Sequence, residues 1–218
     1  MELTKNQTQQ VEKYLDKKMV YYIDIRVEVL DHIISEIEST MLTEKDFDHS
    51  FNKATEKWNV LLQNSSSIYL GYCYVKPLLI INKMKKYGKP HAIKIWSIFI
   101  LMLLSIGFND SISLNVSTLI TDIANITFQT VSYALSLLII LGYVHIYSTK
   151  QKTSFRFLYE TQVLAVVLFP FMISGSFITK HDGLDLLKTM ILVVSLFMFQ
   201  LAIKLYKKHF TLLKKYSF

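Results

Sequence analysis

The chain has little of three residue types that dominate whole classes of protein. Of its 218 residues one is a cysteine, Cys73, three are prolines and six are glycines. A single cysteine excludes a scaffold of intrachain disulfides, and so few glycines and prolines exclude a collagen-like fibre. Charged residues are also scarce at 19%, whereas hydrophobic residues make up 51%, which excludes a disordered chain.

The hydrophobic residues concentrate in four long runs, over residues 92–108, 123–147, 157–178 and 184–206. A bilayer core of about 30 Å needs about 20 mostly apolar residues per helix, so each run is a candidate membrane span. The first 63 residues are different, because they are amphipathic and hold 12 acidic and 8 basic residues. The sequence therefore predicts an all-α protein in which a soluble three-helix domain precedes a four-helix transmembrane bundle.

This pattern divides the chain into four parts. We expect a cytoplasmic helical domain over residues 1–63, an interfacial or linker segment over 64–90, the four-span domain over 91–207 and a basic tail over 208–218. The segment 64–90 has two interpretations. Gly71 and Pro77 interrupt its apolar part, so it is either an interfacial helix with lysines at anionic headgroups or a linker packed on the soluble domain.

The cations predict the orientation of the spans, because cytoplasmic loops are rich in lysine and arginine. Most cations of the second part of the chain flank the spans on one side, and only Lys180 and Lys188 fall on the other. Both termini are therefore expected in the cytoplasm of a bacterium, with the spans in its inner membrane. The net charge of +7 then reflects contact with anionic lipid headgroups and not with nucleic acid, because the soluble part is acidic.

Three helices are expected in the N-terminal domain. Thr4 is a candidate N-cap for the first, and Thr43 with Asp46 three residues later resembles a capping box for the third. The middle helix, about residues 20–41, has an apolar face at helical spacing. Arg26 lies within that face, so we expect its stem to pack there and its guanidinium to find a carboxylate or carbonyl group. The apolar face comprises Ile23, Val27, Leu30, Ile33, Ile34, Ile37 and Met41.

The run Asp24-x-Arg26-x-Glu28-x-x-Asp31-His32, followed by Phe47, Phe51 and Trp58, carries a family resemblance. It resembles the N-terminal domain of uncharacterised multi-pass membrane proteins from Bacteroidetes-type bacteria. More loosely, it is similar to the helical signalling domains of PadR-associated membrane proteins. The resemblance implies a cytoplasmic adaptor or sensor fused to a membrane domain, and it implies no catalytic residues.

Acidic residues and one histidine recur along the middle helix. Asp24, Glu28, His32 and Glu36 are four residues apart and form one stripe, with Asp31 beside it. Such residues can ligate a metal, but a bundle site needs them to face inward, whereas this stripe lies away from the apolar face. We therefore predict a polar face that binds a protein partner, and we expect no metal and no cofactor.

Two ionisable residues fall inside the predicted spans. His145 lies near the inner end of the second span and Glu160 about one turn inside the third. If these helices are antiparallel neighbours, the two side chains form a candidate intramembrane polar pair, either a proton relay or two groups that reach the interface. No phosphate-binding glycine loop, CxxC pair, HExxH or nucleophile elbow is present, so the sequence gives no catalytic residue and an enzyme is the less favoured class.

The leading functional hypothesis is a non-enzymatic signalling, regulatory or scaffold protein that acts through an unknown cytoplasmic partner. The alternative is a small channel, transporter or membrane-perturbing accessory, for example of a bacterial defence system, which needs a homo-oligomer because each span has few polar residues. A membrane enzyme that uses His145 and Glu160 is a third hypothesis. The polar residues that could line a pore, or bond between packed helices, are Gln129, Ser132, Ser136 and Gln200.

Overall fold

A computed structural model describes residues 2–44, 46–67, 70–106, 117–172, 176–179 and 183–216, and these are mostly helical. The end of the first predicted span at 107–108, the interruption expected at Gly175 and the cation Lys180 lie outside the described residues. The chain forms two compact units. Unit 1 contains Met1–Tyr87, Lys150–Phe157 and His209–Phe218, and unit 2 contains Gly88–Thr149 and Leu158–Lys208.

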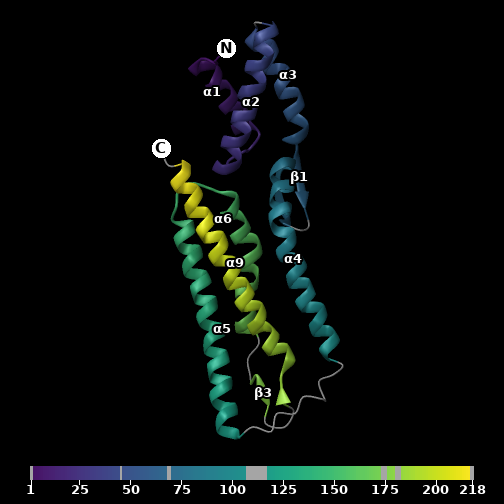
Figure 1. The fold of residues 1–218 in the computed structure, drawn as a ribbon, viewed down its shortest axis with the longest axis vertical. Helices are drawn as coiled ribbons and strands as arrows, with labels where there is room; N and C mark the ends of the chain where they lie inside the picture. The colour runs from purple at the N-terminus through teal and green to yellow at the C-terminus, as the bar shows by residue number, and fades with distance from the viewer. Residues whose placement is uncertain are drawn as a thin grey trace. The chain divides into compact units, whose positions relative to one another are not determined.

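Unit 1 begins with three packed helices, in which α2 (Ile23–Glu44) contacts both α1 (Lys5–Lys17) and α3 (Phe47–Leu61) (Figure 1). The predicted cap of α1 is confirmed, since Thr4 and Gln7 form a reciprocal capping box. The predicted cap of α3 was wrong. Helix α2 continues to Glu44, so Thr43 lies inside it and its hydroxyl donates to the Thr40 carbonyl, while Asp46 accepts from the first amides of α3.

The core of these helices follows the predicted apolar face in the second half of α2 and departs from it in the first half. Ile33, Ile37 and Met41 are buried as expected, but Ile25 and Val29 are buried in place of Ile23 and Val27. Each fully buried aliphatic side chain stabilises the domain by about 1.5–3 kcal/mol. The rotated face has a consequence at the start of α2, because it brings Asp24 inside together with Ile25.

Arg26 makes the contacts expected from its position. Its guanidinium donates to the Asp16 carboxylate at 2.6 Å and to the backbone carbonyls of Val20 and Glu12 at 3.3 and 3.2 Å. These bonds join α2 to the end of α1 and the turn that follows it. That turn includes Met19, which has a positive φ of 57°.

A hairpin follows α3 where an interfacial helix was one of the two expectations. Strand β1 (Asn64–Ser67) pairs antiparallel with β2 (Gly71–Pro77), with Asn64 opposite Pro77 and Ser67 opposite Gly71. Helix formation begins only at α4 (Leu78–Ile106), which runs through Pro90. Ile80, Ile81 and Met84 in the first turns of α4 are buried, so this part of the chain contributes to a core.

Unit 2 is built on α5 (Thr118–Tyr147) and on α9 (Leu186–Tyr216) as far as Lys208. The third apolar run was expected to form one helix and is assigned as short pieces. Three of them follow one another without a break from Ser154 to Val167, and a turn at Leu168 comes two residues before Pro170. A small hairpin, β3 (Ile178–Thr179) with β4 (Gly183–Leu184), precedes α9. The short pieces are α6 (Ser154–Leu158), the π-helical η3 (Tyr159–Val163), α7 (Leu164–Val167) and α8 (Phe169–Met172).

Two helices of the described residues are long and apolar enough to cross a membrane, Thr118–Tyr147 and Lys188–Tyr216. They contain most of the second and fourth predicted runs. The most apolar window of each is only 28% buried. Large apolar side chains such as Leu119, Ile126 and Val144 are therefore exposed along α5, at 70%, 66% and 58%.

Candidate functional site

One end of the predicted polar face lies in unit 1 where the start of α2 meets the loop Lys150–Phe157, a segment whose last four residues already form the first turn of α6. Asp24 is only 8% exposed, and its carboxylate accepts two hydrogen bonds from Ser154, one from the backbone N–H at 2.9 Å and one from the hydroxyl at 2.5 Å. The backbone N–H of Ile23 donates to the Lys152 carbonyl at 2.9 Å. The first turn of α2 therefore binds this loop through both backbone and side chain.

A second buried contact holds the same loop. Thr153 and His209 are fully buried, and the Thr153 hydroxyl lies 2.8 Å from Nδ1 of His209, near the end of α9. The Thr153 oxygen also accepts from the backbone N–H of Arg156 at 3.1 Å. This is the N-cap pattern for α6, so one hydroxyl both starts the helix and joins it to His209.

Aromatic rings complete the contact. The centre of the Phe157 ring lies 5.9 Å from the ring centre of Tyr22, the residue before α2. It lies 5.3 Å from the ring centre of Tyr74 on β2, and these two rings meet edge to face. Phe155 lies 5.3 Å from Tyr87 of α4. Aromatic pairs of this kind contribute about 0.5–1.5 kcal/mol each beyond the area that they bury. We call the loop Lys150–Phe157, with its partners Asp24, Ile23 and His209, the loop-docking site.

The rest of the predicted polar face does not act as one group. Glu28 pairs with Lys83 of α4, whereas Glu36 accepts from Lys57 at 2.8 Å and from the indole of Trp58 at 3.0 Å, both on α3. Asp31 and His32 are exposed. Asp24, Glu28 and Glu36 thus bind three different elements, while Asp31, His32 and the paired Glu28 are exposed on the surface.

Glu36 gives this domain a pH dependence. The hydrogen bond from Lys57 lowers the pKa of Glu36 below 4.5, and the bond from Trp58 acts in the same direction. A carboxylate with a lowered pKa adds stability above its unfolded-state pKa, and that stability is lost as the pH falls below about 4.5. We expect Glu36→Gln to destabilise the domain by about 0.5–1.5 kcal/mol at pH 7 and by less at pH 3.5.

Thermal melts followed by Trp58 fluorescence measure this effect, in a Trp96→Phe background that leaves Trp58 as the reporter. Glu56→Gln on the exposed side of α3 is the matched control and should melt like the parent at both pH values. Equal destabilisation of Glu36→Gln at pH 7 and pH 3.5 would show that the charge of Glu36 contributes nothing.

The predicted intramembrane pair lies in unit 2. Nδ1 of His145 is 2.7 Å from the hydroxyl of Tyr206 on α9, and the two rings are 5.7 Å apart. Glu160 is half-buried in the π-helical η3. His145 is thus bonded to a tyrosine that the sequence did not suggest, and its pairing with Glu160 stays a prediction.

Three of the four polar residues considered as pore lining have partners of their own. The hydroxyls of Ser132 and Ser136 are buried and donate to carbonyls one turn earlier in α5, at 2.9 and 3.1 Å. Gln129 donates to the Tyr133 hydroxyl at 3.0 Å, and Gln200 is exposed on α9. Backbone-bonded, buried serines are typical of close helix packing rather than of a water-filled lining.

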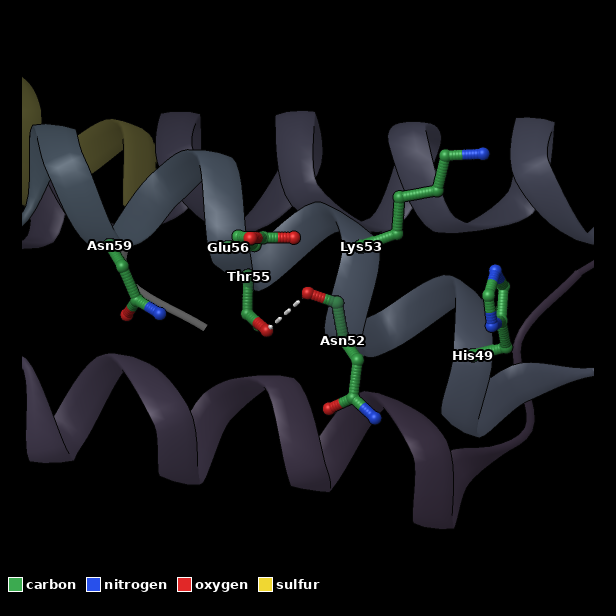
Figure 2. A pocket seen from close by; sticks show the side chains of 6 residues that line it. All are labelled: His49, Asn52, Lys53, Thr55, Glu56 and Asn59. Atoms are coloured by element: carbon green, nitrogen blue, oxygen red, sulfur yellow. Dashed lines mark hydrogen bonds between the residues drawn. The ribbon is translucent and has the colours of Figure 1, made fainter.

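Unit 1 also has a shallow open depression along α3. Figure 2 shows its lining, six side chains of α3: His49, Asn52, Lys53, Thr55, Glu56 and Asn59. The Glu44 carboxylate contacts two of these side chains and lies 2.8 Å from the His49 ring nitrogen Nε2 and 3.0 Å from Nζ of Lys53. At the other end Tyr14 of α1 donates to Asn59 at 3.1 Å, and burial raises the pKa of Tyr14 to about 12, so it stays a donor near neutral pH.

Sequence reasoning missed Ser154, which binds Asp24, and Thr153 and His209, which bind each other. The signal for the first two was present, because Thr153 and Ser154 directly precede the apolar residue Phe155, and hydroxyl residues before an apolar run mark a helix N-terminus. No local signal connects them with Asp24, 130 residues earlier. His209 stands in a basic apolar stretch, where nothing marks it as buried.

Comparison of the chain with protein-family models, with curated proteins and with solved structures finds no match. Among the described residues, no three His, Cys, Asp or Glu side chains gather as a metal site requires. The loop-docking site and the apolar helices are the features of the described residues that bear on function.

Proposed function

We propose that the protein is a multi-pass membrane protein of a bacterial inner membrane, whose N-terminal helical domain is a cytoplasmic adaptor or sensor. In this proposal the four apolar runs form the membrane domain and both termini are cytoplasmic. The domain acts without catalysis, through a protein partner, in a signalling, regulatory or scaffold role. This is also the role implied by the resemblance to Bacteroidetes-type membrane proteins.

Membrane insertion is supported by the exposed apolar surface of α5 and α9. A core helix of a soluble protein is mostly buried, whereas the apolar windows here are 28% buried. An aliphatic side chain left in water forfeits about 1.5–3 kcal/mol relative to burial, and a hydrocarbon environment removes that cost. A lipid-facing surface accounts for exposed leucines and isoleucines that water does not favour.

The observation that carries the adaptor role is the loop-docking site. The loop Lys150–Phe157 continues in sequence from α5, one of the two helices that are long and apolar enough to cross a membrane. Asp24 and Ile23 at the start of α2 bind this loop, so an event that shifts α2 acts directly on it. If a shift of α2 separates Asp24 from Ser154, a buried carboxylate and two buried donors lose their partners, so the shift carries a cost in free energy.

The partner surface in this proposal is the exposed part of the polar face on α2, with Asp31 and His32 at its centre. These two side chains lie about two turns from Asp24 on the same helix. A partner bound there changes the position or the order of α2, and Asp24 transmits that change to the loop.

The experiment is capture of the partner by the tagged full chain, with chemical crosslinking in intact cells. We expect Asp31→Arg with His32→Glu to reduce the yield of the partner by about tenfold or more, as for residues at the centre of an interface. Gln9→Arg with Gln10→Glu, on the exposed side of α1, is the matched control. Purified partner should then change the rate at which trypsin cleaves after Lys152 in the loop.

Two results would contradict the proposal. Capture of the same proteins by the Asp31 and His32 variant would remove the partner surface. A loop cleavage rate that the partner leaves unchanged would show that binding is not transmitted to the loop-docking site.

A further inference from the structure

A polar side chain interrupts the exposed apolar side of α9. Gln200 is exposed, and among the described residues its amide has no hydrogen-bond partner. It stands twelve residues after Lys188 and seven before Lys207, which at 1.5 Å per residue places it about 18 Å and about 10 Å from them along the axis. Because α9 spans the membrane in the function proposed above, this amide lies among acyl chains.

Other polar side chains on the exposed sides of these helices bond to their own backbone. The hydroxyls of Thr127 and Thr130 on α5 donate to the carbonyls of Ile123 and Ile126, at 2.8 and 2.7 Å. The primary amide of Gln200 has two N–H donors and an acceptor oxygen, and lipid chains offer no partner for any of them. An unpaired amide in hydrocarbon is unfavourable, so Gln200 favours a polar partner within the membrane.

The described part of unit 2 does not supply that partner. Helix α4 comes close on one side, where the ring centre of His91 lies 6.2 Å from that of Phe197, but Gln200 stays exposed. The side of α9 opposite Gln200 packs inward instead. The residues buried on that side are Ser195, Met198, Leu201, Ala202 and Leu205. The partner of the amide is therefore expected from another molecule.

The residues around Gln200 have the spacing of a helix pair. Val193, Leu196 and Ile203 are 44%, 43% and 37% exposed. With Gln200 they are spaced three, four and three residues apart, so at 100° per residue they lie within an arc of about 80°. We call these four residues the Gln200 stripe. This is the a and d spacing with which two helices pack side by side, and one polar residue at such a position fixes their register.

We propose that the Gln200 stripe binds the same stripe of a second copy of the chain. Both copies insert with the same orientation, so their α9 helices are parallel and a two-fold axis relates them. The amide is complementary in charge to a second amide, because its N–H end is partly positive and its C=O end partly negative. Each Gln200 donates to the amide oxygen of the other, and the apolar residues of the stripe pack on both sides of this pair.

This inference rests on the membrane insertion proposed above and adds an interaction surface to it. The stripe ends at Ile203, because Lys204 and Lys207 follow on the same side of α9. Their stems are long enough to carry the charges to the headgroups, so the lysines of the two copies need not meet. The contact is thus confined to the apolar part of the helix, where an interhelical amide bond has no competition from water.

The test counts the subunits of the full chain in liposomes, by photobleaching of one fluorophore attached to each N-terminus, over a series of protein-to-lipid ratios. We expect dimers that dissociate on dilution. Gln200→Leu should raise the dissociation constant of the dimer by about tenfold, as for the loss of two hydrogen bonds between membrane helices. Gln200→Asn keeps a primary amide and should dimerise more strongly than the leucine variant.

Thr130→Val is the matched control. It removes a polar group from an exposed position of α5, but one that bonds to its own helix, so the dissociation constant should not change. Disulfide crosslinking in membranes is the second measurement, in a Cys73→Ser background. Ile203→Cys in the stripe should crosslink two copies, whereas Val144→Cys, exposed near the end of α5, should not.

Several results would overturn this inference. They are a wild-type monomer at every ratio, a Gln200→Leu dimer as stable as the wild type, and equal crosslinking through Ile203→Cys and Val144→Cys. A count above two subunits would assign Gln200 to a ring and would also exclude the two-fold pair.

A separate measurement keeps this inference distinct from the proposed function. Resistance of the wild-type protein to carbonate extraction from membranes reports insertion, whatever the number of subunits. A protein that resists extraction but remains monomeric contradicts the dimer alone. A protein released by carbonate contradicts membrane insertion.

Discussion

Asp24→Ala should open the loop Lys150–Phe157 to trypsin. Asp24 is buried and accepts from both the backbone N–H and the hydroxyl of Ser154, so its removal leaves two buried donors without a partner. Bonds to a charged group and the cost of unpaired donors amount to about 2–3 kcal/mol. Cleavage through local opening should therefore become about 30- to 150-fold faster.

The bond to follow is the one after Lys152, because the carbonyl of that bond accepts from Ile23 in the docked loop. Asp31→Ala on the exposed side of the same helix is the control and should be cleaved like the wild type. Ser154→Ala should accelerate cleavage less, since it keeps the backbone bond to Asp24. If Asp24→Ala is cleaved at the wild-type rate, the loop is held by its other contacts and Asp24 does not control it.

The second large effect is expected at Gly142 in α5. A Cβ atom at this position would lie 2.9 Å from the hydroxyl of Tyr159, closer than such contacts occur. That hydroxyl cannot move freely, because Tyr159 is 1% exposed and donates to the Ile139 carbonyl at 2.7 Å. Gly142→Ala should destabilise unit 2 by about 1–3 kcal/mol, and a valine there should cost more.

Tyr159→Phe supplies the decisive control, because it removes the oxygen that the new methyl group meets. The next nearest atoms are 3.9 Å from the added Cβ, an ordinary contact distance. In that background Gly142→Ala should be neutral or stabilising, since alanine favours a helix over glycine by about 1 kcal/mol. Thermal unfolding of the detergent-purified protein measures both effects. Equal losses from Gly142→Ala in the two backgrounds would contradict this packing.

The sequence predicted those parts of unit 1 that depend on near neighbours. Thr4 was predicted as a cap from its place before the first helix, and the structure confirms that cap and adds Gln7 as its reciprocal partner. Arg26 could be assigned a carboxylate or carbonyl partner because a guanidinium within an apolar face needs one. The prediction for Thr43 was wrong because Asp46 can fill the same role. Asp46 directly precedes α3 and caps it, whereas Thr43 lies within α2.

The composition of the segment 64–90 did not indicate the hairpin that β1 and β2 form. Tyr72, Tyr74 and Val75 are residues typical of strands, and Gly71 and Pro77 stand at the two ends of β2. The lysines and isoleucines that follow belong to α4, and their pattern favoured an amphipathic helix for the whole segment. Separating the two parts required the pairing with β1, which is a contact between strands and not a property of either one.

The loop-docking site marks the limit of prediction from a single sequence. Acidic side chains are exposed in most proteins, so Asp24 was assigned to a surface stripe with Glu28 and Glu36. Its burial depends on Ser154, which is 130 residues away. The π-helical turn at Tyr159–Val163 in the third apolar run is similar, because it depends on packing and leaves hydropathy unchanged.

Unit 1 is assembled from three separate stretches of the chain, and this has a consequence for biosynthesis. Its three stretches are separated in the chain, so the ribosome completes α1 to α3 long before it makes Thr153, and Thr153 long before it makes His209. The buried bond between these two residues can form only after the apolar helices between them have been synthesised. Completion of the loop-docking site therefore requires the intervening chain. A ribosome-arrested intermediate that ends before His209 should lack the bond to Thr153, although it contains every residue that joins the loop to Asp24 and Ile23.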